Sequence, residues 1–191
     1  MINEVLAYIT SFIAVGFVVT AYFVKKRSLY LLFQSLNLFC LVLSYLFSGE
    51  FFVMVGLSVS LIRTVTFFAY EEKQKEAPLI LAIVFASLTV AAYFIVNLWI
   101  LKTAKPLDIL CLVALVMYSF IFKIQNLKTV RFCMLLPLSI SIVYNLFSAA
   151  TVFVVLSYAI ELLADILSIC KYHLLLNRKR INTFKKEKSG L

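Results

Sequence analysis

Charged residues are scarce in this chain, and their scarcity excludes a water-soluble fold. Only 14% of the 191 residues are charged and 64% are apolar, whereas soluble domains have roughly 25% and 45–50%. Apolar runs of about twenty residues recur along the sequence, and each is long enough to cross a hydrocarbon core about 30 Å thick. The sequence therefore predicts a single membrane domain with no soluble domain inserted between its spans.

Residue types that carry catalysis or bind metals are also rare. The single histidine, His173, is predicted at the end of the last span, and the four cysteines have no paired spacing. Neither a zinc motif nor a Cys-His nucleophile is therefore indicated. With only four glycines, the chain has no glycine-rich loop that could cradle a phosphate. We predict that the protein is not an enzyme and uses no metal and no cofactor.

Hydropathy along the chain predicts an all-α transmembrane bundle of seven helices. The first apolar run is too long for the hydrophobic region of a secretory signal and has no small-residue cleavage site, so it is taken as a span. The expected helices are Val5–Val24, Leu29–Phe47, Phe51–Tyr70, Leu79–Leu101, Leu107–Phe122, Val130–Phe147 and Thr151–Leu176.

Basic residues between these helices lie almost wholly on one side of the predicted membrane. With seven spans, Lys102 and Lys105 are the only ones on the other side. The positive-inside rule then places the N-terminus outside and the basic tail, residues 177–191, in the cytoplasm. The formal charge of +9 gathers at helix ends and in this tail, which favours contact with membrane lipids over nucleic acid.

Two similar segments indicate an internal repeat. Tyr45-Leu46-Phe47-Ser48 closes the second predicted helix, and Tyr144-Asn145-Leu146-Phe147-Ser148 closes the sixth. The pattern predicts a parallel 3+1+3 arrangement, with chance similarity among apolar segments as the alternative. Its parts are residues 1–76 (first triple-helix unit), 77–105 (linker helix) and 106–176 (second triple-helix unit). The sequence leaves both a monomer and a homodimer open.

Polar residues recur at helical spacing on four of the predicted helices, so they predict a polar seam inside the bundle. The candidate site residues are Gln34, Asn37, Arg63, Asn145, Glu161 and Asp165. A charge inside a bilayer needs a partner, and the simplest one is an ion pair from Arg63 to Glu161 or Asp165. Two interpretations stay open: polar contacts that fix the helices, and a pathway whose amides and charges bind a solute.

The segment Phe12 to Phe68 contains a Lys-Lys-Arg turn, a helix with Gln and Asn, Tyr45-Leu-Phe-Ser-Gly49 and Leu61-Ile-Arg63-Thr64. This pattern resembles the YgjV family of bacterial inner membrane proteins, and the likeness continues through residues 144–148 to the basic end of the seventh helix. The resemblance implies a multi-pass protein of the bacterial cytoplasmic membrane.

The layout is also similar to the 3+1+3 transporters of the SWEET and PQ-loop type, which implies a solute pathway between the two triple-helix units. This chain lacks their Pro-Gln motif and has no proline in its first three predicted helices. Their proline-hinged gating and their sugar specificity are therefore not carried over.

Together these observations favour a carrier or facilitator that moves a small polar solute through the seam. The alternative is a binding or scaffold protein that recognises a lipid or a peptide without moving it and uses the basic tail as an anchor.

Overall fold

The computed structural model describes residues 2–49, 51–96, 106–147 and 155–171. These residues form seven helices and no strand, as the sequence predicts. The helices are α1 Ile2–Phe23, α2 Arg27–Ser48, α3 Phe51–Glu72, α4 Leu79–Phe94, α5 Asp108–Ile121, α6 Leu127–Phe147 and a seventh helix over residues 155–171, named here the C-terminal helix. The ends of the predicted fourth and seventh helices lie outside the described residues.

Four of these helices, α1, α2, α3 and α6, are long and apolar enough to cross a membrane. The α4 and α5 helices are apolar but shorter, with 16 and 14 residues. At a rise of 1.5 Å per residue they are about 24 and 21 Å long. The chain is thus a membrane protein with several apolar helices, and a count of seven full spans stays a prediction.

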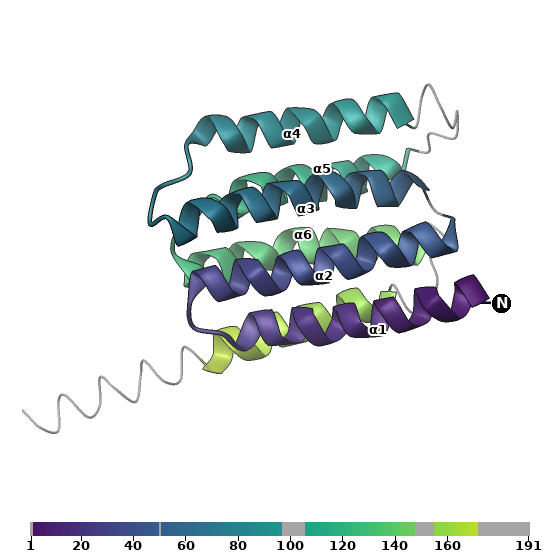
Figure 1. Cartoon of the computed structure of the whole chain (residues 1–191), viewed down its shortest axis with the longest axis horizontal. Helices are drawn as coiled ribbons and strands as arrows, with labels where there is room; N and C mark the ends of the chain where they lie inside the picture. Colours follow the sequence, from purple (N-terminus) through teal and green to yellow (C-terminus); the bar gives the residue numbers. More distant parts are fainter. Residues whose placement is uncertain (1, 50, 97–105, 148–154, 172–191) are drawn as a thin grey trace, which may run out of the picture.

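The helices lie side by side in two layers, as Figure 1 shows. One layer holds α1, α2 and α3 in chain order, α4 lies at its edge, and α5, α6 and the C-terminal helix return behind it. As a result α5 lies opposite α3, α6 opposite α2, and the C-terminal helix opposite α1. Hydrogen bonds made by side chains join α3 to α5 and α1 to the C-terminal helix.

The turns follow from local chemistry. The α2 helix ends at Gly49, whose φ of 79° is left-handed and whose N–H donates to the carbonyl of Leu46. Glycine adopts this conformation without the steric cost that other residues meet. Before α4, Pro78 occupies the N-cap in an extended conformation, a position where its ring-restricted φ and its missing N–H cost nothing.

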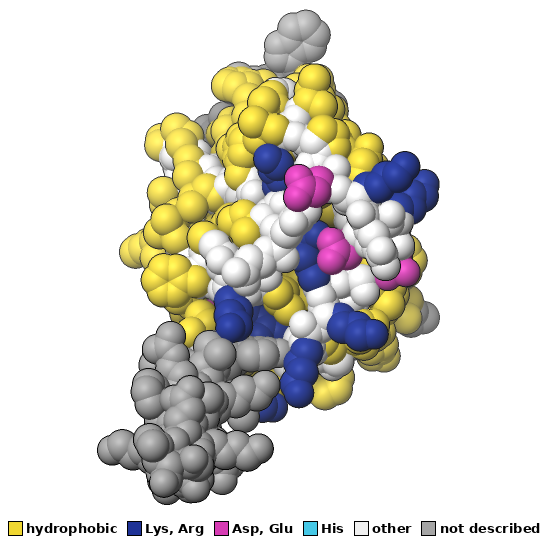
Figure 2. Space-filling model, turned by 90° about the vertical axis from the view of Figure 1, so that its left-hand side faces the viewer, with side chains coloured by type: hydrophobic (Ala, Val, Ile, Leu, Met, Phe, Trp, Pro, Cys, Tyr) yellow, Lys and Arg dark blue, Asp and Glu magenta, His cyan; other side chains and the backbone are white. Residues whose placement is uncertain are grey.

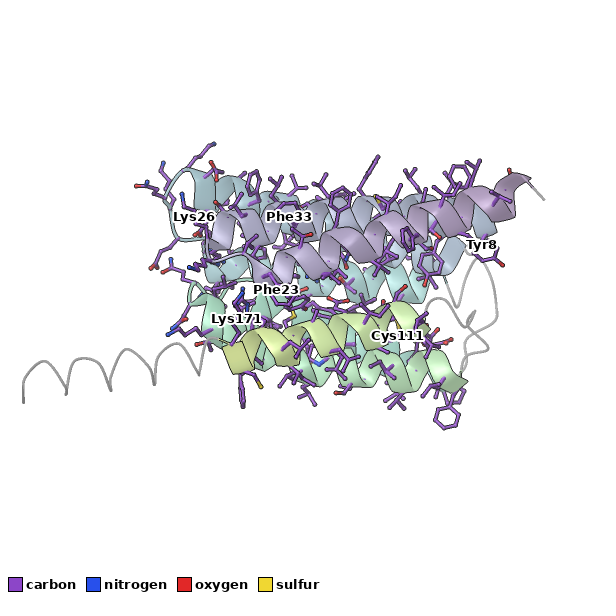
Figure 3. The ribbon with its side chains drawn as sticks, turned by 90° about the horizontal axis from the view of Figure 1, so that it is seen from below. Tyr8, Phe23, Lys26, Phe33, Cys111 and Lys171 are labelled. Atoms are coloured by element: carbon purple, nitrogen blue, oxygen red, sulfur yellow. The ribbon has the colours of Figure 1, made fainter. Side chains whose placement is uncertain are left out.

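Large apolar side chains cover the outside of the bundle, which suits a surface in contact with lipid. Phe12 is 81% exposed and Phe147 is 75% exposed. Figure 3 shows such side chains pointing outward along the length of the helices.

Lys and Arg gather at one end of the molecule, where the α1–α2, α3–α4 and α5–α6 turns meet, as Figure 2 shows. We call this the basic end. Here Lys171 of the C-terminal helix lies over the ring of Phe23, with its Nζ 5.4 Å from the ring centroid (Figure 3).

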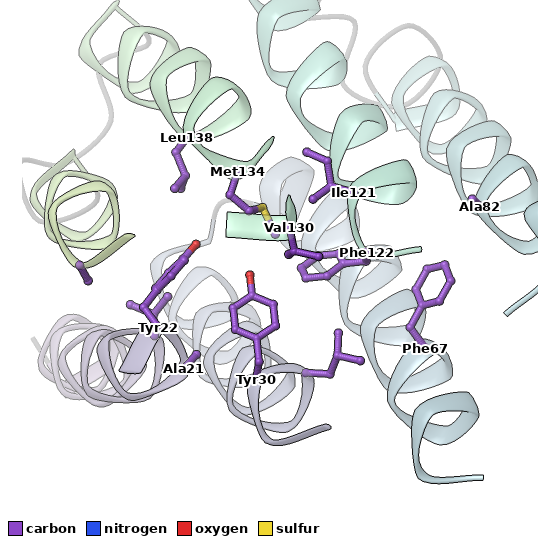
Figure 4. Packing of buried hydrophobic residues seen from close by; sticks show 13 residues of the cluster. Ala21, Tyr22, Tyr30, Phe67, Ala82, Ile121, Phe122, Val130, Met134 and Leu138 are labelled. Atoms are coloured by element: carbon purple, nitrogen blue, oxygen red, sulfur yellow. The ribbon is translucent and has the colours of Figure 1, made fainter. Parts of the chain in front are cut away.

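The core lies between the two layers and includes Tyr22, Tyr30, Phe122 and Met134 (Figure 4). The rings of Tyr22 and Tyr30 meet edge-on with centroids 5.8 Å apart. Both hydroxyls point into the space between the layers. The core is therefore amphipathic, since its aromatic rings pack against apolar residues while the Tyr22 hydroxyl donates to Glu161 in the seam.

Candidate functional site

A cavity lies between the two layers, and α2, α3, α5, α6 and the C-terminal helix all contribute to its wall. We call it the seam cavity. Its volume is about 70 Å³, and because one water needs roughly 10–15 Å³ it has room for about five waters. Its polar and charged lining includes Gln34, Asn37, Ser60, Arg63, Ser141, Asn145 and Glu161.

Five of the six predicted site residues line this cavity; the exception is Asp165, which is fully buried. Asp165 follows Glu161 by one turn of the C-terminal helix, outside the cavity wall. The five come from four helices in both layers. Residues that were predicted from helical spacing to lie on polar faces therefore surround one cavity. Their role in binding a solute stays a prediction.

Arg63 makes different contacts from those predicted. Its Nη1 donates to the carbonyl of Leu115 at 3.1 Å and to the Oγ of Ser119 at 2.9 Å. Its guanidinium carbon lies 5.2 Å from the ring centroid of Phe122. The predicted ion pair from Arg63 to Glu161 or Asp165 is therefore wrong, because α3 lies opposite α5 and its arginine meets that helix first.

Glu161 is anchored from the other side of the seam. Its Oε1 accepts a hydrogen bond of 3.0 Å from the hydroxyl of Tyr22 on α1, and its carboxylate interacts with the Gln34 side chain. Asn37 lies one turn beyond Gln34 and donates to its Oε1 at 3.5 Å. Amide groups and a carboxylate thus form one continuous polar strip along the cavity.

Asp165 lies deeper in the bundle. Neither of its carboxylate oxygens has a hydrogen bond within the described part of the chain. It interacts electrostatically with Glu161 and with Arg131. Arg131 is 1% exposed, and its Nη2 donates to the carbonyl of Val24 at 2.6 Å. In the described segments no group of three or more His, Cys, Asp or Glu side chains comes together to hold a metal.

The model of the Imp-YgjV family, described as a bacterial inner membrane protein, matches residues 5–174. The chain belongs to this family. No curated protein and no solved structure matches it. The match confirms the YgjV resemblance and the inner membrane location, and it includes every candidate site residue. The likeness to SWEET and PQ-loop transporters stays a prediction.

Two arginines of this Imp-YgjV protein that are absent from the predicted site residues, Arg27 and Arg131, are both tied into the bundle. Arg27 pairs with Glu71, and its Nη2 donates to the carbonyl of Phe122 at 2.6 Å. A signal for Arg131 exists in the sequence, because residues 131, 134, 138, 141 and 145 follow one helical stripe. The stripe of α6 therefore begins with a buried charge.

Proposed function

We propose that this Imp-YgjV protein is a carrier or facilitator for a small polar solute, which passes through the seam between the two layers, and that it is not an enzyme. The observation that supports this most directly is the seam cavity. Seven polar or charged side chains from four helices line it, five of them predicted site residues, inside a bundle whose outer surface is apolar. Ionisable groups in such a position are costly, so a functional role is the default expectation.

In this proposal the amides of Gln34, Asn37 and Asn145 hydrogen-bond the solute, and Arg63 and Glu161 supply charge. Asp165 acts from behind Glu161, with which it interacts electrostatically. The cavity has room for only about five waters, so passage of a solute requires the bundle to open. The two layers would then move relative to each other to open the seam on either side of the membrane.

We further propose that the two layers are parallel repeats, related by a two-fold axis that runs along the helices. Two reciprocal contacts support this. Arg27, the first residue of α2, donates to the carbonyl of Phe122, the residue after α5. Arg131, the fifth residue of α6, donates to the carbonyl of Val24, the residue after α1. Each unit's second helix thus holds the end of the other unit's first helix.

The repeat gives the proposed carrier an orientation. Both units begin their first helix at the end opposite the basic end (Figure 1). The positive-inside rule favours the basic end in the cytoplasm, which leaves the start of α1 outside.

The proposal is tested with the purified full chain in two steps. A thermal-shift screen against pools of polar metabolites comes first, because a ligand that binds the folded state stabilises it by mass action. Hits are then assayed for uptake into proteoliposomes by the wild type and by Asn145→Leu, whose control is Gln125→Leu at an exposed position in the α5–α6 turn. We expect uptake by the wild type and the control and its loss in Asn145→Leu.

Deletion of residues 178–191 separates this function from the scaffold alternative. A carrier that still inserts keeps its uptake, because the residues assigned to the seam cavity lie between Gln34 and Glu161. Binding of a lipid or peptide that disappears with the tail, together with no uptake of any polar solute, would instead favour the scaffold.

A further inference from the structure

The seam cavity is bounded by two opposite charges that do not neutralise each other. Arg63 lies on α3 and Glu161 on the C-terminal helix, in opposite layers of the same cavity. Within the described residues, Arg63 binds neutral groups of α5, and Glu161 accepts from the neutral hydroxyl of Tyr22. Each charge therefore has hydrogen-bond support but no counter-charge in direct contact.

The remaining buried charges do not supply those counter-charges. Arg131 and Asp165 interact with each other electrostatically. Arg27 pairs with Glu71, and Asp108 accepts from Tyr144. Among the described residues, Arg63 and Glu161 are the two charged side chains that line the seam cavity. An isolated charge in a medium of low dielectric is costly unless an opposite charge comes close.

Two polar atoms in the wall of the cavity also lack a partner. They are Nε of Arg63 and Oγ of Ser60, and within the described residues neither has a hydrogen bond. Both residues are 1% exposed. Buried polar groups normally have a hydrogen-bond partner. These atoms therefore indicate a ligand that enters the cavity and forms hydrogen bonds with them.

The two walls call for different chemistry. Ser60 precedes Arg63 by three residues on α3, so their unsatisfied donors lie on the same face and suit a carboxylate, which accepts charge-assisted hydrogen bonds from a guanidinium. On the other wall, Oε1 of Glu161 accepts from Tyr22, and the carboxylate also interacts with the Gln34 side chain. A carboxylate accepts several hydrogen bonds, so Glu161 can also receive an ammonium group.

We propose that the solute is a small zwitterion, with its carboxylate on Arg63 and Ser60 and its ammonium group on Glu161. A neutral solute leaves both protein charges uncompensated, and a simple anion or cation compensates only one. A zwitterion compensates both protein charges and adds no net charge to the interior. The volume of about 70 Å³, or roughly five waters, favours an amino acid with a very short side chain. This inference rests on the proposed carrier function.

The test compares four probes with the same number of non-hydrogen atoms: glycine, the anion glycolate, the cation glycinamide and neutral glycolamide. Uptake of each is measured in proteoliposomes of the full chain, beside thermal shifts in detergent. We expect glycine to be preferred over each of the other three by at least about tenfold, equivalent to about 1.4 kcal/mol. Equal uptake of glycolamide and glycine overturns the zwitterion and leaves the carrier.

Two other outcomes are equally distinct. If none of the four probes acts but another polar metabolite is taken up, the zwitterion inference fails and the carrier function stands. If no polar solute of any class binds or enters, the carrier function itself fails.

Charge variants give a readout that a merely structural role would not produce. Glu161→Gln should lose glycine and retain or gain glycolate, because the cationic wall remains. Arg63→Gln should lose glycine and retain glycinamide. Matched controls are Glu72→Gln and Lys128→Gln, two exposed positions outside the cavity, whose preferences should stay those of the wild type. Parallel loss of all four probes in a folded Glu161→Gln protein would contradict the assignment.

A second variant tests the same wall of the cavity if Arg63→Gln does not fold. Ser60→Ala removes one hydroxyl without altering a charge. We expect it to weaken glycine and glycolate severalfold and to leave glycinamide unchanged. An equal effect on glycinamide would overturn the placement of the carboxylate on this wall.

Discussion

The basic end and the seam cavity both bury arginines, but the two regions differ in what the guanidinium groups meet. At the basic end, Arg27 pairs with Glu71 and Arg131 interacts electrostatically with Asp165. Each of these arginines also donates to a carbonyl just beyond the end of a helix in the opposite layer. In the seam, Arg63 has neutral partners and faces open space.

The arginines at the basic end stabilise the fold, whereas the arginine in the seam is placed to bind a ligand. Helix-end carbonyls carry partial negative charge and lack partners within their own helix, so a guanidinium placed there satisfies both groups and ties the layers together. A guanidinium beside a cavity keeps donors available for a ligand. We therefore expect variants at the basic end to affect stability most, and variants in the seam to affect binding most.

Arg131→Met should cause the largest loss of stability. It deprives the Val24 carbonyl of its donor and leaves the buried Asp165 without its counter-charge. Losing a hydrogen bond from a charged donor costs about 1.5–3 kcal/mol, and the lost attraction between Arg131 and Asp165 adds to that cost. The measurement is the free energy of unfolding in detergent, taken from a denaturant titration.

The double variant Arg131→Met with Asp165→Asn checks the cause of that loss. It should recover part of the stability, with a coupling energy of about 0.5–3 kcal/mol between the two sites. Strict additivity of the two single changes would show that these residues do not act as a pair.

Tyr22→Phe should have the next largest effect, because it removes the hydroxyl that donates to Glu161. Hydrogen bonds to a charged group contribute about 1.5–3 kcal/mol. Tyr30→Phe is the matched control, since the Tyr30 hydroxyl has no hydrogen bond within the described residues. We expect that control to change the free energy of unfolding by less than about 0.5 kcal/mol, as for substitutions that break no contact. Equal losses in the two variants would contradict the assigned role of Tyr22.

Glu71→Gln should have a small effect. It removes the charge of a half-buried residue that pairs with Arg27, and such pairs contribute about 0.2–1 kcal/mol. The loss should shrink further in high salt, because screening weakens a pair that water can reach. Unfolding titrations at two salt concentrations measure this, and a loss that salt does not alter would argue against an electrostatic origin.

Arg63→Met should have the smallest effect on the free energy of unfolding, but it should abolish ligand binding. The variant loses bonds to neutral groups, but it also removes a buried charge that lacks a counter-charge, so the net loss should stay below about 1 kcal/mol. The thermal shift with glycine should vanish at the same time. A destabilisation as large as that of Arg131→Met would remove the contrast between the two regions.

Much of the fold could be predicted from the sequence, because a bilayer allows few solutions for an apolar chain. The boundaries shifted where polar residues extend a helix. The α6 helix begins at Leu127 and not at Val130, since the Asn126 side chain accepts from the Lys128 N–H and caps its first turn. Hydropathy does not register such a polar cap.

The sequence by itself determined the membrane class, the helices and the polar face of each helix, because hydrophobicity and helical spacing are properties of the chain alone. Only the tertiary structure decided which charges meet. Arg63 binds α5 and Arg131 approaches Asp165, because α3 lies opposite α5 and because Arg131 projects from the buried stripe of α6. Spacing along a helix fixes a direction, whereas a partner depends on the helix that packs against it.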